Sequence, residues 1–243
     1  MPARGVTQLC VRCGGFRLLP TVHALRWDVL ELGGALPCPS AYNAAEYGAY
    51  VDCVVRHLYA GQGQFRDEFA ERARMPRIRR AYSRARGPHV TAAVLSALFT
   101  VSKAKQAFIN GEPPPSKFSA SIGVSWLARL APMLAKCTPT GPVQCNFGVR
   151  VTDQHGNSVY GEPDALVGAT VIELKASKSM QCSSKWKCQT LMYAALLRHN
   201  GVCVSEARIV NVSTGLCLRA QLASWSEHET LAWACSKASE PCP

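Results

Sequence analysis

Apolar positions recur along the chain with two different periods, and the change from one to the other divides it. Between residues 41 and 136 they return every three or four positions, which predicts helices that bury one face. From residue 143 onward, short β-branched and apolar runs are separated by turn residues, which predicts strands alternating with helices. We therefore expect a helical N-terminal portion followed by an α/β core with a central mixed sheet.

Three helices are expected in the first portion, at residues 43–58, 90–110 and 119–136. Asn43 is the expected N-cap of the first helix, and Glu46 follows it by three residues, as in a capping box. Five apolar residues recur on one face of this helix and form its expected core stripe: Tyr47, Val51, Val54, Val55 and Leu58.

The second portion is expected to hold two hairpins, a helix, two further strands and a last helix. The helix at 185–198 consists largely of good helix formers, and Ser226 begins the last one as a capping residue. The expected elements are strands 143–150 and 151–159 around a turn at 153–157, strands 164–167 and 170–175, a helix at 185–198, strands 206–212 and 216–222, and a helix at 226–237.

The second hairpin carries the candidate chemistry. Gly168 and Ala169 form the expected two-residue loop, because Gly at the first loop position suits a type II′ turn. This loop places Asp164 directly opposite Glu173, and such cross-strand partners have Cβ atoms roughly 4.5–5.5 Å apart. Lys175 lies two residues beyond Glu173 and returns to the same face. Two carboxylates and an ammonium group are thus expected to converge.

Converging carboxylates suit a hard divalent cation, because Mg²⁺ takes oxygen ligands and usually binds through one or two carboxylates. The Leu174 carbonyl could add a third protein oxygen, and Lys175 could orient water and offset charge in the transition state. On the 185–198 helix, Gln189 and Tyr193 are four residues apart and share a face. This pair is the expected second wall of the site.

The order Asp164, Glu173-x-Lys175, then Gln189-x-x-x-Tyr193 resembles the core of the PD-(D/E)XK nuclease superfamily. The last pair points to its RecB-like, lambda-exonuclease-like branch. The resemblance implies a restriction-endonuclease-like α/β core in which these five residues are catalytic. It also implies a DNA nuclease that depends on Mg²⁺ or Mn²⁺ and acts in recombination or repair. An exonuclease is expected ahead of a flap or single-strand endonuclease.

The resemblance further implies a metal ligand on the first helix. Nucleases of this branch carry Gly-x-x-x-His there, with the His approaching the metal, and here Gly48 is followed by Asp52. The implied ligands are then Asp164, Glu173, the Leu174 carbonyl and Asp52. An aspartate can ligate Mg²⁺ or Mn²⁺; the alternative is that Asp52 is a solvated edge of the helix.

The chain is strongly basic, with 27 Lys and Arg against 16 Asp and Glu and a net charge of +11. This favours an anionic partner, nucleic acid before an anionic membrane surface. Eight arginines crowd residues 66–86, where they could follow a phosphate backbone or form a solvated face. The residues expected to contact nucleic acid are Arg72, Arg74, Arg77, Arg79, Arg80, Arg84 and Arg86.

Localisation and domains follow from what the chain lacks and from the resemblance. No apolar run approaches the roughly 18 residues that span a bilayer, and no secretory segment follows the first residues. We therefore expect an intracellular protein, in the nucleus or cytoplasm. The compact size resembles stand-alone recombination nucleases of viruses and phages, which implies a virus-infected host cell as one setting. The expected domains are an N-terminal extension (1–40) and a nuclease domain (41–243), with a helical part (41–136) and a catalytic core (143–243).

The twelve cysteines are expected to be mostly reduced, with small buried hydrophobic side chains as the default interpretation. Cys10-x-x-Cys13 is half a zinc site without a second pair at finger spacing. Some RecB-like nucleases hold an iron–sulfur cluster, but Cys217, Cys235 and Cys242 are too scattered to resemble its late trio. Two alternatives to the nuclease stay open: a non-catalytic nucleic-acid-binding protein on a nuclease-like scaffold, and a zinc-dependent adaptor.

Overall fold

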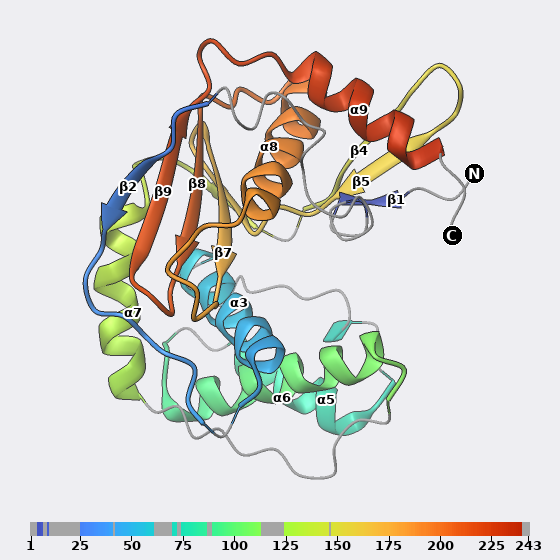
Figure 1. Ribbon diagram of the computed structural model, residues 1–243. Helices are drawn as coiled ribbons and strands as arrows, with labels where there is room; N and C mark the ends of the chain where they lie inside the picture. The colour runs from blue at the N-terminus through green and yellow to red at the C-terminus, as the bar shows by residue number, and fades with distance from the viewer. Residues whose placement is uncertain are drawn as a thin grey trace.

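The centre of the fold is a six-stranded mixed sheet (Figure 1). The computed structural model describes residues 4–6, 9, 25–40, 42–60, 70–71, 74–86, 89–112, 124–145 and 147–239. The strands lie in the order β2 (Asp28–Glu31), β9 (Leu216–Gln221), β8 (Glu206–Asn211), β7 (Thr170–Lys175), β6 (Ala165–Val167) and β3 (Val143–Gln144). Of the strand pairs in this described sheet, β7 and β8 are parallel and the rest antiparallel, which confirms the expected mixed α/β class.

A smaller sheet carries strands β1 (Arg4–Gly5), β5 (Ser158–Gly161) and β4 (Val149–Thr152), in that order. β4 and β5 form a hairpin around residues 153–157, as expected. The expectation of one strand over 143–150 was wrong. β3 instead pairs with β6 in the larger sheet, and the chain leaves that sheet before β4 begins. Gly148 lies in this break, where an added Cβ would approach Tyr160 to 2.5 Å.

The helices are α3 (Ala44–Ala60), α5 (Pro76–Ala85), α6 (Ala92–Ile109), α7 (Val124–Cys137), α8 (Ser184–His199) and α9 (Glu227–Ser239). Oδ1 of Asn43 accepts the backbone N–H of Glu46 at 2.8 Å, which confirms the predicted cap of α3. The Glu46 carboxylate pairs with Lys103 on α6 and so ties the two helices together. Among the described residues, no helix has both the length and the apolar character needed to cross a bilayer.

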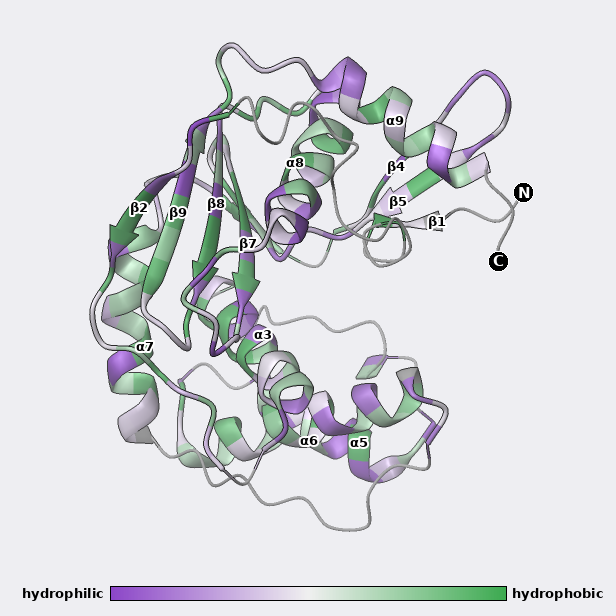
Figure 2. Cartoon of the chain, in the orientation of Figure 1, coloured by the Kyte–Doolittle hydropathy of each residue, from purple (hydrophilic) through white to green (hydrophobic). Residues whose placement is uncertain are grey.

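Each face of the larger sheet is covered by its own apolar core (Figures 1 and 2). The core on the face that presents Ile172 and Leu174 also contains residues of α3, α5, α6 and α7; within it α6 packs on α3, and α5 packs on α6. Helices α8 and α9 and the smaller sheet pack on the face that presents Leu166 and Val171. Four members of the predicted α3 stripe are fully buried and Leu58 is partly buried. The alternation along β7 therefore directs residues 171, 173 and 175 toward α8.

The segment assigned to an N-terminal extension also contributes to the sheet. β2 pairs with β9 through residues 28–31 and 216–219 and forms one edge of the sheet. After β2, the backbone N–H groups of Leu32 and Leu36 donate to the carbonyls of Gly215 and Val212. The division into an extension and a nuclease domain stays a prediction.

Candidate active site

The β6–β7 hairpin has the predicted register. Val167 pairs with Thr170 and Ala165 with Ile172, so the next pair outward sets Asp164 against Glu173. The loop residue Gly168 has a φ of 57°, in the left-handed region that favours glycine. Local turn chemistry therefore positions the two carboxylates.

Asp164 contacts both strand β7 and helix α3. Its Oδ2 accepts the backbone N–H of Leu174 at 2.7 Å, and its Oδ1 lies 3.7 Å from Nη2 of Arg56. Burial raises the pKa of Asp164 well above its usual value, and the neighbouring carboxylates of Glu173 and Asp52 raise it further. The Asp164 side chain as a whole keeps 16% exposure.

Glu173 is the more deeply buried of the two acids, with 3% exposure. Lys175 donates to its Oε1, while its Oε2 is buried and accepts no hydrogen bond from the residues described. Burial raises the pKa of Glu173, whereas the Lys175 ammonium opposes that shift. A buried carboxylate oxygen without a donor is unfavourable unless a cation or water meets it.

Helix α8 supplies the second wall, as the sequence predicted. Lys175 Nζ donates to Gln189 Oε1 at 3.1 Å, and Gln189 Nε2 donates to the Tyr193 hydroxyl at 3.0 Å. A Cβ on Gly161 would lie 2.6 Å from the Tyr193 ring, so the ring needs a glycine there. Glu173, Lys175, Gln189 and Tyr193 thus form one continuous chain of hydrogen bonds.

Arg56 was not identified in the sequence, yet it lies between two acids of the cluster. Its Nε donates to Oδ1 of Asp52 at 2.7 Å, and its Nη2 faces Asp164. Asp52, an expected metal ligand, therefore forms an ion pair with Arg56 in this structure. The sequence feature that could have identified it is the helix row Gly48, Asp52 and Arg56, whose members are spaced four positions apart.

Asn211 is a second residue that the sequence interpretation missed. It is 3% exposed and lies beside Lys175 in the parallel β7–β8 register. Its side-chain Nδ2 donates to the carbonyls of Ser177 and Ser179, and its Oδ1 accepts from the Ser177 N–H. Asn211 therefore fixes the segment that leads from Lys175 toward α8. The sequence feature that could have identified Asn211 is a polar residue at the end of an otherwise largely apolar strand.

The donor set fits a hard divalent cation such as Mg²⁺ or Mn²⁺. Asp164 and Glu173 present carboxylate oxygens on one face, and Oε2 of Glu173 has no donor among the described residues. Mg²⁺ usually keeps several waters and binds through one or two carboxylates, so this pair with the Leu174 carbonyl would be sufficient. In the described part of the chain, no group of three or more His, Cys, Asp or Glu side chains is arranged to hold a metal ion.

The predicted basic surface lies on and around α5. Arg72 falls outside the described residues, Arg74 precedes the helix and Arg86 is its C-cap. The other four predicted arginines belong to α5 itself, and all six described arginines are exposed: Arg74, Arg77, Arg79, Arg80, Arg84 and Arg86. None of them forms part of the carboxylate cluster in the contacts described.

The cysteines that raised the question of a metal centre are only partly described. Cys10, Cys13 and Cys242 lie outside the described residues. Cys217 and Cys235 are buried, and burial raises the pKa of the Cys217 thiol to about 12. Both described thiols are therefore protonated at neutral pH and pack as small apolar groups.

The structure thus brings seven side chains into one cluster: Asp52, Arg56, Asp164, Glu173, Lys175, Gln189 and Tyr193. Six of them were predicted from the sequence. Comparison with models of protein families, with curated proteins and with solved structures found no match to this chain. The functional argument therefore depends on the geometry of the cluster.

Proposed function

We propose that the protein is a divalent-metal-dependent DNA nuclease that hydrolyses phosphodiester bonds. One observation carries the proposal: the buried Glu173 lies beside the partly buried Asp164 and accepts from Lys175, while its other oxygen accepts no hydrogen bond from the residues described. Two acids and a lysine in this arrangement suit hydrolysis of a charged ester.

Each side chain has a role that its contacts support. Asp164, Glu173 and the Leu174 carbonyl would hold Mg²⁺ or Mn²⁺, while Asp52, the further ligand expected from the sequence, is paired with Arg56. The bound cation would supply Lewis acidity and activate water near neutral pH. Lys175, oriented by Glu173 and Gln189, would position the attacking water and stabilise negative charge on the phosphate. Tyr193 keeps Gln189 in the orientation that Lys175 requires.

The proposal extends to the fold and the branch of nucleases. The mixed sheet and the packing of α8 on β7 support a restriction-endonuclease-like core. The Gln189–Tyr193 pair supports the RecB-like, lambda-exonuclease-like branch. We place the activity in intracellular DNA recombination or repair, with an exonuclease that acts on ends as the first expectation.

The test is cleavage of end-labelled linear DNA beside covalently closed circular DNA, with Mg²⁺, Mn²⁺ or EDTA. An exonuclease degrades the linear substrate alone and stops in EDTA. Glu173→Gln should abolish cleavage, whereas Glu162→Gln, which alters an exposed carboxylate hydrogen-bonded to Tyr160, should leave it unchanged. Cleavage that persists in EDTA or in Glu173→Gln contradicts the proposal.

The second candidate is a non-catalytic nucleic-acid-binding protein on the same scaffold. The exposed arginines of α5 favour it, since nucleic-acid binding needs no carboxylate pair. Tight DNA binding without cleavage in either metal would support this candidate over the nuclease.

A further inference from the structure

Helix α5 presents arginines on two opposite sides, because its buried residues occupy a stripe between them. Ile78 and Ala85, seven residues apart, lie in that stripe. Arg77 and Arg84 flank it on one side, and Arg79 and Arg86 lie on the other. The two sides border two separate concavities.

The first concavity is a groove of about 310 Å³ between α5 and α6, the α5–α6 groove. Arg77, Arg80 and Arg84 form its α5 wall, and small side chains of α6 form the other: Ala93, Ser96, Ala97 and Thr100. Neither helix contains an Asp or a Glu. No described residue lining the groove is acidic, so the groove favours an anion.

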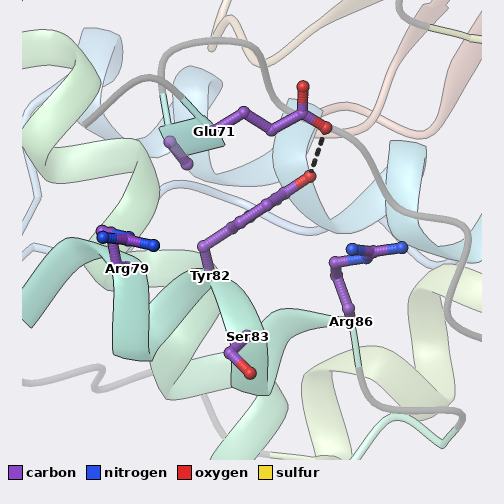
Figure 3. A pocket seen from close by; sticks show the side chains of 6 residues that line it. Glu71, Arg79, Tyr82, Ser83 and Arg86 are labelled. Atoms are coloured by element: carbon purple, nitrogen blue, oxygen red, sulfur yellow. Dashed lines mark hydrogen bonds between the residues drawn. The ribbon is translucent and has the colours of Figure 1, made fainter. Parts of the chain in front are cut away.

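The second concavity has a different character (Figure 3). Arg79 and Arg86 lie on either side of Tyr82, whose hydroxyl donates to Glu71 Oε1 at 2.8 Å. The Arg86 guanidinium is 5.9 Å from the centre of the Tyr82 ring. Because Glu71 lines this pocket and Tyr82 is already engaged, it is less suited to a phosphate than the α5–α6 groove.

We propose that the α5–α6 groove binds the sugar–phosphate backbone of a nucleic acid strand. Arg77, Arg80 and Arg84 rise along α5 over about 10 Å, since each helical residue adds about 1.5 Å. Phosphates of one strand are about 3.4 Å apart along a duplex axis, so the row can face about three of them. The small α6 side chains leave room for the strand, and the exposed Ser96 hydroxyl can donate to it.

The groove shares no residue with the carboxylate cluster. It would hold the polynucleotide without regard to sequence, because only the backbone is contacted. The choice of DNA as the polynucleotide rests on the proposed nuclease function. Binding itself does not, and it can be measured where no metal-dependent cleavage occurs.

The experiment compares two matched double variants, Arg77→Gln/Arg84→Gln in the groove and Arg79→Gln/Arg86→Gln on the opposite side. Each removes two positive charges seven residues apart on exposed positions. Binding of a labelled oligodeoxynucleotide, single-stranded or duplex, is followed by fluorescence anisotropy in EDTA over a range of KCl concentrations. The groove variant should lose about tenfold in affinity, and its log–log salt slope should flatten by about 1.4–1.8, the loss of two phosphate contacts. The opposite variant should keep the wild-type slope.

Thermal melting shows whether each variant folds. Two further variants test the inference if a glutamine variant does not fold. Arg77→Lys/Arg84→Lys should retain the slope, and Ser96→Glu, which adds a carboxylate to the α6 wall, should weaken binding. Equal losses in both glutamine variants, or unchanged binding in the groove variant, would overturn the inference. So would preferential binding to phosphatidylserine vesicles. Because binding is measured in EDTA, wild-type protein that binds with the expected salt slope but does not cleave DNA in Mg²⁺ or Mn²⁺ separates failure of the proposed catalysis from failure of the groove.

Discussion

Nη2 of Arg56 lies 3.7 Å from Oδ1 of Asp164, so a helix residue faces an acid that the hairpin positions. The same guanidinium donates to Asp52. Its side chain is 10% exposed, which places a positive charge among three carboxylates in a poorly solvated region. Arg56 therefore offsets repulsion that a divalent cation would also offset.

Replacing Arg56 with methionine should destabilise the metal-free protein. Removing one partner of a buried ion pair leaves an uncompensated charge and typically costs about 3–5 kcal/mol. Urea denaturation in EDTA should show a loss near the lower figure, since the site is not fully closed to water. Mg²⁺ should stabilise Arg56→Met more than the wild type, because the cation replaces the missing charge. Arg56→Lys is the control, and an equal response to Mg²⁺ in all three proteins would refute this role.

Asp164→Asn should stabilise the metal-free protein at neutral pH. The pKa of Asp164 is raised, so its folded form favours the proton and its contribution to stability is greatest below the unfolded pKa of about 3.9. That contribution is lost as pH rises through the raised value. An asparagine side chain does not ionise, so the variant does not lose stability as pH rises, and its amide oxygen can still accept from the Leu174 N–H. Thermal melting in EDTA should show a higher melting temperature than the wild type at neutral pH, and the gain should shrink on acidification. A gain independent of pH would contradict this cause.

The features that the sequence allowed us to predict are local ones. Gly168 determines the loop, the loop determines the register, and the register sets Asp164 against Glu173, which is only nine positions away. Gln189 and Tyr193 follow from helical spacing in the same way. Strand alternation then returns Lys175 to the shared face.

The relationships that escaped prediction are long-range. Arg56 meets Asp164 across more than a hundred residues, and β2 joins β9 across almost the whole chain. Such contacts depend on how helices and strands pack, which a periodic pattern does not encode. The split of residues 143–150 between two sheets also results from tertiary packing, because β3 pairs with β6 in the larger sheet.

Gly161→Ala should destabilise the protein through Tyr193. The new Cβ would lie 2.6 Å from the ring, and overpacking of this kind costs about 1–3 kcal/mol. A double-mutant cycle isolates the cause, because Tyr193→Ala removes the ring that is displaced. Urea denaturation should show a clear loss for Gly161→Ala in the wild type and a smaller one in Tyr193→Ala. Equal losses in both backgrounds would mean that the glycine serves another contact.

The last prediction separates metal binding from catalysis. Lys175→Ala should lower turnover by about 10²–10³-fold, the typical loss when one electrostatic stabiliser is removed. Its affinity for Mg²⁺ should be unchanged or higher, because a positive charge next to Glu173 is gone. Asp164→Ala should lose both, since a cation held by a few protein oxygens depends on each of them. Calorimetric metal titration beside DNA cleavage on the same preparations tests this, with Lys178→Ala as an exposed control. Wild-type cleavage by Lys175→Ala would show that the activity belongs to other residues of the chain.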